Sequence, residues 1–154
     1  MQISGLLKPE AIRNVSSISS KKRLFQEIGE IASNVYGLSP TETFGALQDR
    51  ESLGPTGVGR GVALPHARLD SVSQVHSVFI RLEKPVEFES ADRLPVDLFF
   101  ALFAPSDSGV EHLKALALVS RTMRDRAVCE KLRANDNVSA LYAILTEGPS
   151  SQAA

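Results

Sequence analysis

The sequence has a single cysteine, Cys129, among its 154 residues. One cysteine excludes an internal disulfide, and such a composition suits a reducing compartment. Cys129 lies in the segment Val128-Cys129-Glu130-Lys131-Leu132, where we interpret it as a half-buried helix residue. No neighbouring motif lowers the pKa of its thiol, so we expect no reactive role.

The sequence also lacks an excess of charge and any long hydrophobic run. It has 17 basic against 18 acidic residues, a net charge of −1, which argues against a nucleic-acid partner. Leu98 to Ala104 is the longest apolar run, far below the ~20 residues of a membrane helix. The N-terminus lacks the basic start and apolar stretch of a signal peptide. We therefore expect a cytoplasmic protein without membrane insertion.

Apolar periodicity predicts one α/β domain over residues 1–148, with residues 149–154 as a flexible tail. The predicted class is a mixed β-sheet flanked by helices on both sides. Expected helices run over 20–36, 39 to about 50, 108–123, 126–133 and 138–146, and expected strands over 61–64, 75–82, 86–88 and 96–103.

Finer patterns add expectations about helix ends and buried faces. Ser20 and Gly37 should bound the first helix, and Ser39-Pro40-Thr41-Glu42 and Ser108-Gly109-Val110-Glu111 are capping-box patterns. In strand 75–82, Val78, Ile80 and Leu82 alternate with Ser77, Phe79 and Arg81, which predicts that only one face is buried. Strand 96–103 is apolar enough to be central. The expected buried face of the helix after Ser108 consists of Leu113, Leu116, Ala117, Ser120 and Met123.

A glycine-rich segment leads into a histidine: Gly54-Pro-Thr-Gly-Val-Gly-Arg-Gly-Val-Ala-Leu-Pro-His66. Glycine has no Cβ, so backbone N–H groups can approach an anion closely. Pro65 favours an extended Leu64, which should place His66 at a strand end beside the loop. A histidine there can hold, receive or pass on a phosphoryl group. The alternative is a structural histidine bonded to the backbone.

The other two histidines differ in their setting. His112 lies in the first turn of the helix expected to begin after Ser108, where free N–H groups and the helix dipole favour an anion. A solvent-facing residue is the alternative. His76 starts a strand without a supporting pattern, so we interpret it as structural or exposed. The histidine spacings match no common zinc signature, and no metal is expected.

Several arginines accompany the glycine loop. Arg50 precedes it and Arg60 and Arg68 flank its far part, and arginine is well suited to multidentate phosphate recognition. Ordinary surface charge fits Arg60 best. Four further arginines in residues 121–133 alternate with acidic residues, which indicates a solvated helix face. The loop has neither the Walker A lysine nor Gly-x-Gly-x-x-Gly, so no nucleotide cofactor is expected.

Together these residues resemble a known family. The string Arg50-Glu51-x-x-Gly54-x-Thr56-Gly57-x-Gly59-x-Gly61-Val-Ala-Leu-Pro65-His66-x-Arg68 closely resembles the phosphohistidine motif of mannitol/fructose-class enzyme IIA domains of the phosphoenolpyruvate-dependent phosphotransferase system. His112-Leu113-x-x-Leu116 is similar to the second histidine segment of that family, and Ser20–Leu24 looks like its nitrogen-regulatory branch. The resemblance covers nearly the whole chain and also implies a mixed sheet flanked by helices.

The resemblance implies roles for individual residues. His66 is the residue that is transiently phosphorylated, and Pro55, where the nitrogen-type branch often has serine, offers no N–H to the phosphate. No cofactor or metal is implied, because the energy for transfer lies in a nitrogen–phosphorus bond. The implied catalytic residues are His66, His112 and Arg50, and the implied phosphoryl-binding residues are Thr56, Gly57 and Arg68.

The implied function is that of a regulatory phosphoryl carrier. It would accept the phosphoryl group from a small histidine phosphocarrier protein (HPr- or NPr-like) and signal to regulatory target proteins. Two alternatives stay open: a free-standing sugar-transport enzyme IIA that passes the group to a IIB domain, and a partner-binding module without phosphotransfer. The sequence leaves open the target, the phosphorylated ring nitrogen and the oligomeric state.

Overall fold

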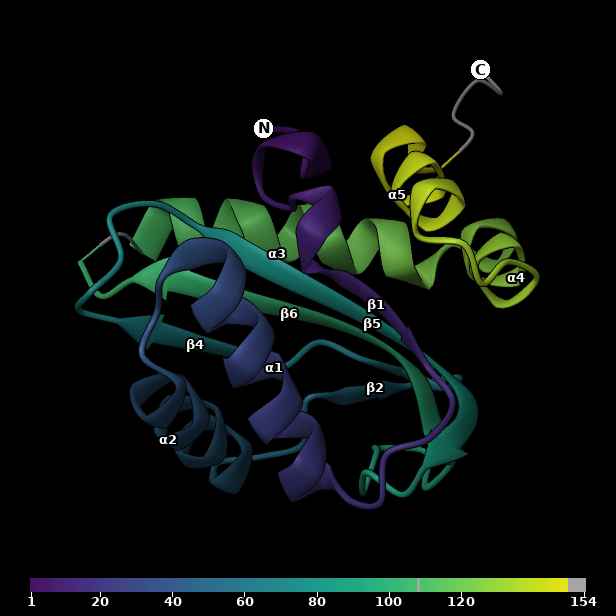
Figure 1. Ribbon diagram of the computed structural model, residues 1–154, viewed down its shortest axis with the longest axis horizontal. Coiled ribbons are helices and arrows are strands. Elements are labelled where there is room, and N and C mark those ends of the chain that lie inside the picture. Colours follow the sequence, from purple (N-terminus) through teal and green to yellow (C-terminus); the bar gives the residue numbers. More distant parts are fainter. Residues whose placement is uncertain (108, 150–154) are drawn as a thin grey trace.

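Two long antiparallel strands lie in the middle of the sheet, and shorter strands extend it on both sides (Figure 1). The computed structural model describes residues 1–107 and 109–149, and within these residues six strands form the mixed sheet. The strands are β1 (Ile12–Val15), β2 (Gly57–Gly59), β3 (Val62–Ala63), β4 (His66–Leu69), β5 (His76–Val86) and β6 (Val96–Pro105). β1 runs parallel to β5, β3 and β4 run parallel to β6, and β2 pairs antiparallel with β3.

Helices cover both faces of this sheet, which confirms the predicted class (Figure 1). α1 and α2 pack against each other on one face, and α3 lies on the other, with α4 and α5 at its C-terminal end. Their bounds are α1 (Lys21–Tyr36), α2 (Pro40–Ser52), α3 (Gly109–Arg124), α4 (Arg126–Arg133) and α5 (Val138–Glu147), and two 3₁₀ turns, η1 (Ile3–Gly5) and η2 (Pro9–Ala11), precede β1. None of the described helices is long and apolar enough to cross a membrane.

The predicted starts of the first two helices are confirmed. Ser20 Oγ accepts from Arg23 N–H at 3.1 Å, and Ser39 Oγ accepts from Glu42 N–H at 3.2 Å. Gly37 ends α1 with φ 74°, as a left-handed C-cap does. The capping box of α2 is only half formed, because the Glu42 carboxylate accepts from Ser71 Oγ at 2.7 Å instead.

Two further predictions, the capping box at Ser108 and the C-terminal tail, concern residues that the structure does not describe. The expected capping box at Ser108 and the expected tail fall on residue 108 and residues 150–154, which lie outside the described residues. The helix that follows does begin at Gly109.

The prediction of a single buried face for the strand after Val75 is wrong. Ser77 and Phe79 were expected on the exposed face, yet both are fully buried in β5. Helices on both sides of the sheet cover both rows of side chains, so alternation in the sequence did not mark a solvent face. β5 also extends to Val86 and includes the start of the expected brief strand, whereas Phe88 is buried outside any strand.

The predicted buried face of α3 is also wrong. Leu113 is 65% exposed and Ala117 is exposed, whereas Met123 is buried as expected. The buried residues are His112, Ala115, Val119, Thr122 and Met123. Leu116 is only partly buried against the core, so the buried side of this helix is turned away from the apolar stripe that the sequence indicated.

Candidate functional site

The three residues that the resemblance implies as catalytic meet at one end of the sheet. Arg50 lies in the last turn of α2, His66 opens β4 and His112 lies in the first turn of α3. Three separate segments therefore assemble one surface hollow, which has a volume of about 430 Å³. The hollow, called here the His66 pocket, is lined by Ala46, Asp49, Arg50, Leu53, His66, Ala67, Arg68 and His112.

The backbone around Pro65 explains how His66 reaches this pocket. β3 ends at Ala63, and the chain resumes as β4 at His66, still beside β6. Pro65 cannot donate a ladder hydrogen bond, but its carbonyl accepts from Leu102 N–H at 2.9 Å. His66 was expected at a strand end, and it lies at this interruption.

Hydrogen bonds define the two ring nitrogens of His66. Nδ1 lies 2.9 Å from the carbonyl oxygen of Leu64, which can only accept, so Nδ1 carries the proton. Arg50 Nε–H donates to Nε2 at 3.2 Å, which requires a lone pair on Nε2. Arg50 is itself held by a 3.0 Å bond from Nη1 to the Gly54 carbonyl. His66 is therefore a neutral imidazole with its basic nitrogen beside a guanidinium group.

His112 has the opposite tautomer. Arg68 Nε–H donates to His112 Nδ1 at 3.2 Å, so the proton of His112 lies on Nε2. The two histidine rings meet edge to face, with centroids 5.5 Å apart. Among the described residues, His112 Nε2 has no hydrogen-bond partner although it is buried. This arrangement leaves an unused N–H donor on a ring that packs against the ring of His66.

Burial keeps both rings neutral. Loss of solvent lowers the pKa of His66 below 6.5; the Leu64 carbonyl opposes this shift and Arg50 adds to it. The pKa of His112 is also lowered, first by burial and then by the neighbouring His66 and Arg68. At neutral pH the pocket therefore offers one nitrogen lone pair, one neutral N–H donor and two arginines.

Thr56 and Gly57, which the resemblance implies as phosphoryl-binding residues, do not line this pocket. Thr56 is 4% exposed, and its hydroxyl and its N–H both donate to the Glu51 carboxylate. Gly57 pairs with β3 and packs against Ser90, where an added Cβ would come within 2.4 Å of the hydroxyl oxygen. A phosphoryl-binding role for these two residues stays a prediction.

Glu51 was not assigned a role from the sequence, although it stands in the matched motif. Its carboxylate is paired with Lys21 Nζ at 3.0 Å and holds the Thr56 backbone. It thereby fastens the start of the glycine loop to the C-terminal end of α2. The adjacency of Arg50 and Glu51 was the available signal: one side chain faces the pocket and the other faces the loop.

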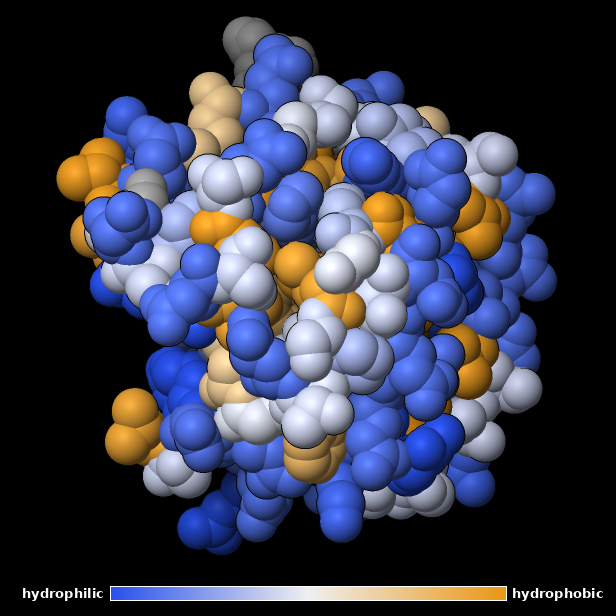
Figure 2. All heavy atoms as spheres, turned by 60° about the vertical axis from the view of Figure 1, so that its left-hand side comes forward, coloured by the Kyte–Doolittle hydropathy of each residue, from blue (hydrophilic) through white to orange (hydrophobic). Residues whose placement is uncertain are grey.

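The surface on this side of the molecule carries apolar side chains between charged ones. Figure 2, which brings the end of the sheet with α2 and β4 forward, shows orange groups separated by blue residues. Leu53 on the pocket rim is 83% exposed, and Val110 and Leu113 at the start of α3 are both 65% exposed. Leu53 lines the pocket, and Val110 and Leu113 lie close to His112 in the sequence of α3; sequence periodicity had placed Leu113 in the core.

The described residues contain no group of three histidine, cysteine or acidic side chains that could hold a metal ion together. The pocket's own donors are imidazole and guanidinium groups, which suit an anion.

Comparisons with known proteins agree with this geometry. A family model described as "Phosphoenolpyruvate-dependent sugar phosphotransferase system, EIIA 2" matches residues 5–148. The chain belongs to this family. The resemblance stated from the motif is thereby confirmed, and so is its extent over nearly the whole chain.

Individual relatives of the chain are named for regulation. A "Nitrogen regulatory protein" of Bradyrhizobium diazoefficiens is 42% identical over 99% of this chain and 100% of its own length. A protein of the same name from Escherichia coli is 38% identical over 96% of this chain and 91% of its own. The crystal structure of nitrogen regulatory protein IIA-Ntr from Neisseria meningitidis covers 94% of this chain and 99% of its own, with 37% identity and a TM-score of 0.88.

Proposed function

We propose that this enzyme IIA domain is a regulatory phosphoryl carrier that accepts a phosphoryl group on His66 Nε2. The observation that carries the proposal is the pairing of two histidines of opposite tautomer in one arginine-lined pocket. Nε2 of His66 has the lone pair that a nucleophile needs, and Nδ1 is occupied by its bond to Leu64.

The transfer needs no group beyond these side chains. The Nε2 lone pair attacks phosphorus on a phosphohistidine of a small carrier protein, the bond from phosphorus to the carrier's nitrogen breaks, and that nitrogen keeps the electron pair. The phosphorylated ring retains its proton on Nδ1, and the Leu64 carbonyl stabilises the positive charge that develops there. Charge on the three equatorial oxygens is then met by positioned donors.

Arg50 and His112 supply those donors in this proposal. Arg50 Nε–H lies 3.2 Å from the attacking nitrogen, so a small shift takes it to a phosphoryl oxygen. The unpartnered His112 Nε2–H is buried, so it loses nothing when it binds the incoming anion. Arg68 acts through His112 by fixing its tautomer.

Phosphorylation changes the charge at an exposed apolar rim. It adds about −1.5 to −2 charges at the pocket, which Leu53 lines and whose residue His112 is followed by the exposed Leu113. A target that docks over this rim would bind the two forms differently. The regulatory interpretation is favoured over sugar transport because relatives that match this chain over nearly their full length are named for nitrogen regulation. Both interpretations use the same His66 chemistry.

Phosphotransfer in a reconstituted relay tests the proposal. The chain is incubated with phosphoenolpyruvate, its enzyme I and a histidine phosphocarrier, and the phosphate mass increase is measured on the intact protein. We expect an acid-labile, base-stable phosphate that His66→Ala abolishes. His76→Ala is the matched control, since His76 stacks on Tyr36 outside the pocket.

Two results would contradict the proposal. Label that persists in His66→Ala would remove His66 as the acceptor. Binding of the carrier without any mass increase would favour the partner-binding module. Transfer onward to a purified IIB domain at a rate matching the first step would instead support sugar transport.

A further inference from the structure

A second and larger hollow lies at the other end of α3. It has a volume of about 740 Å³ and is formed by the β2–β3 turn, the last turn of α3 and the start of α4. This α4 hollow, as it is called here, shares no lining residue with the His66 pocket. Arg124 lies twelve positions after His112, or about 18 Å along α3. Nothing in the phosphotransfer proposal uses the α4 hollow.

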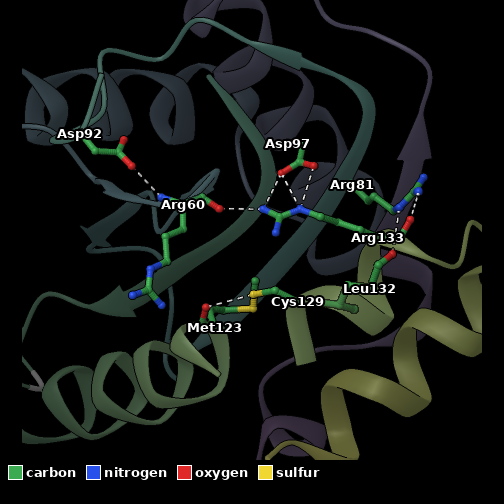
Figure 3. Close-up of polar contacts among 8 residues, drawn as sticks. All are labelled: Arg60, Arg81, Asp92, Asp97, Met123, Cys129, Leu132 and Arg133. Atoms are coloured by element: carbon green, nitrogen blue, oxygen red, sulfur yellow. Dashed lines mark hydrogen bonds and ion pairs between the residues drawn. The ribbon is translucent and has the colours of Figure 1, made fainter. Parts of the chain in front are cut away.

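Arginines dominate its lining. Arg60, Arg121, Arg124, Arg126 and Arg133 all contribute to it. Only one of the five is neutralised by a contact: Arg133 pairs with the Asp97 carboxylate at 2.9 Å and donates to the Arg60 carbonyl at 2.8 Å (Figure 3). Within residues 1–107 and 109–149, the other four guanidinium groups make no hydrogen bond or ion pair.

The acidic residues nearby do not cancel this charge. Asp125, which caps α4 through a 3.0 Å bond from Val128 N–H, and Glu130 also line the α4 hollow, so its lining has five arginines against two carboxylates. Asp92 lies on the far side of Arg60 and binds its backbone N–H at 2.8 Å, not its guanidinium group (Figure 3). A chain of net charge −1 thus concentrates positive charge at one concave place. Unpaired like charges repel one another, and a bound anion relieves that repulsion.

The lining also has an apolar part. Val58 is the middle residue of β2 and is 51% exposed, although it is a large apolar residue. Val62 and Met123 contribute buried apolar surface. Pockets of roughly 300–1,000 Å³ hold small organic molecules, so the α4 hollow is larger than a single inorganic anion requires. Guanidinium groups bind phosphate bidentately and stack on planar rings.

We propose that the α4 hollow binds a small phosphorylated organic anion with a planar, apolar part, of the nucleoside polyphosphate class. The phosphates face the four unpaired guanidinium groups of Arg60, Arg121, Arg124 and Arg126. The planar part lies against Val58 and the neighbouring apolar side chains. The glycine loop alone was not expected to hold a nucleotide; here Val58 and Arg60 of that loop face the last turn of α3 and the helix α4, which supply the other arginines.

Amide chemical shifts of the full chain, titrated with ATP in the presence of EDTA, test this proposal. We expect saturable shifts confined to residues 58–62 and 121–133, with Arg50, His66 and His112 unmoved. Pyrophosphate should bind more weakly at the same residues, and adenosine should not bind. His66→Ala should bind ATP as the wild type does, so failure of the phosphotransfer proposal leaves this test intact.

Variants that remove one positive charge each test which arginines contribute to ATP affinity. Arg124→Gln and Arg126→Gln should each weaken ATP binding by about tenfold, the size of one charge-assisted hydrogen bond. Arg23→Gln is the matched control, because Arg23 is an exposed helical arginine bonded only to Gln26. Absence of saturable binding up to 10 mM ATP (about the weakest useful affinity), or equal weakening by the control, would overturn the proposal. Tighter binding of an acidic peptide than of ATP would overturn its ligand class.

Discussion

The two histidines of the His66 pocket differ because Nδ1 meets a hydrogen-bond acceptor in one ring and a donor in the other. A backbone carbonyl occupies Nδ1 of His66, and a guanidinium group occupies Nδ1 of His112. A carbonyl accepts and a guanidinium donates, so the ring proton lies on Nδ1 in His66 and on Nε2 in His112. The same residue type thereby provides a nucleophile on one side of the pocket and a hydrogen-bond donor on the other.

The lowered pKa values of His66 and His112 predict a pH dependence. Both rings should titrate below 6.5, so His66 should stay nucleophilic at pH values where a free imidazole is protonated. Between 6.5 and the lowered folded values, the unfolded chain binds more protons, so the free energy of unfolding should fall as the pH drops through this window. NMR titration of the ring protons measures both midpoints. A midpoint above 6.5 for either ring would contradict the neutral pocket.

Replacement of Arg68 tests whether it positions His112. In Arg68→Gln, Nδ1 of His112 loses its charged donor, so its tautomer should become mixed in ¹⁵N ring spectra. Phosphorylation of His66 should slow by about tenfold. Arg68→Lys retains a cationic donor and should recover part of the rate. Direct phosphate binding by Arg68 would instead slow the transfer with the His112 tautomer unchanged.

At the scale of elements, the glycine in the short strand β2 is explained by packing, although the sequence suggested a binding motif. Gly57 belongs to a glycine string that suggested phosphate contacts, yet it lies against Ser90 and pairs with Ala63. Its neighbour Thr56 is tied to Glu51 at the end of α2. At Gly57 the absence of a side chain is therefore required by close packing of the hairpin, which in turn orients the chain toward His66.

Gly57→Ala should destabilise the protein by about 1–3 kcal/mol, the usual cost of overpacking. The new Cβ would meet Ser90 Oγ at 2.4 Å and Ser90 Cβ at 2.9 Å, and only movement of the backbone relieves the second contact. Gly45→Ala is the matched control: it is a helical glycine in α2 with no atom within 4 Å of the added Cβ, and it should stabilise by about 0.5–1 kcal/mol. Urea unfolding measures both, and equal effects would contradict this account.

At the scale of the whole molecule, the sheet connects two distant hollows. The His66 pocket lies where α2, β4 and the start of α3 meet, and the α4 hollow lies where α3 ends. Arg81 on β5 fastens the second region to the sheet: it donates to the Leu132 carbonyl at 2.9 Å and to the Arg133 carbonyl at 2.7 Å (Figure 3). These bonds satisfy carbonyl groups at the end of α4, which a helix cannot pair internally.

Arg81→Leu should therefore loosen α4 as well as lower global stability. We expect a loss of about 1.5–3 kcal/mol in the free energy of unfolding, the range for a hydrogen bond to a charged group. Hydrogen exchange should rise most in α4, while the amides around His66 stay protected. Arg23→Leu, which removes a bond to Gln26 on the same helix, should change neither. Unchanged exchange in α4 would contradict the role assigned to Arg81.

Local sequence determined what depends on neighbouring residues. Ser20, Gly37 and Ser39 marked helix ends correctly, because a cap is formed by groups within a few residues. The apolar run before Pro105 marked the central strand, since only a strand covered on both faces is so uniformly apolar. The motif around His66 identified the family for the same reason: its residues are close in sequence.

Only the tertiary structure decided what depends on contacts between distant segments. Ser77 and Leu113 were assigned to the wrong environments, because the faces that helices cover depend on packing and not on periodicity alone. The tautomers of His66 and His112, the tie from Glu51 to Thr56 and the arginines of the α4 hollow arise where separate elements meet. Sequence thus named the histidines, and the fold determined which nitrogen of each is free.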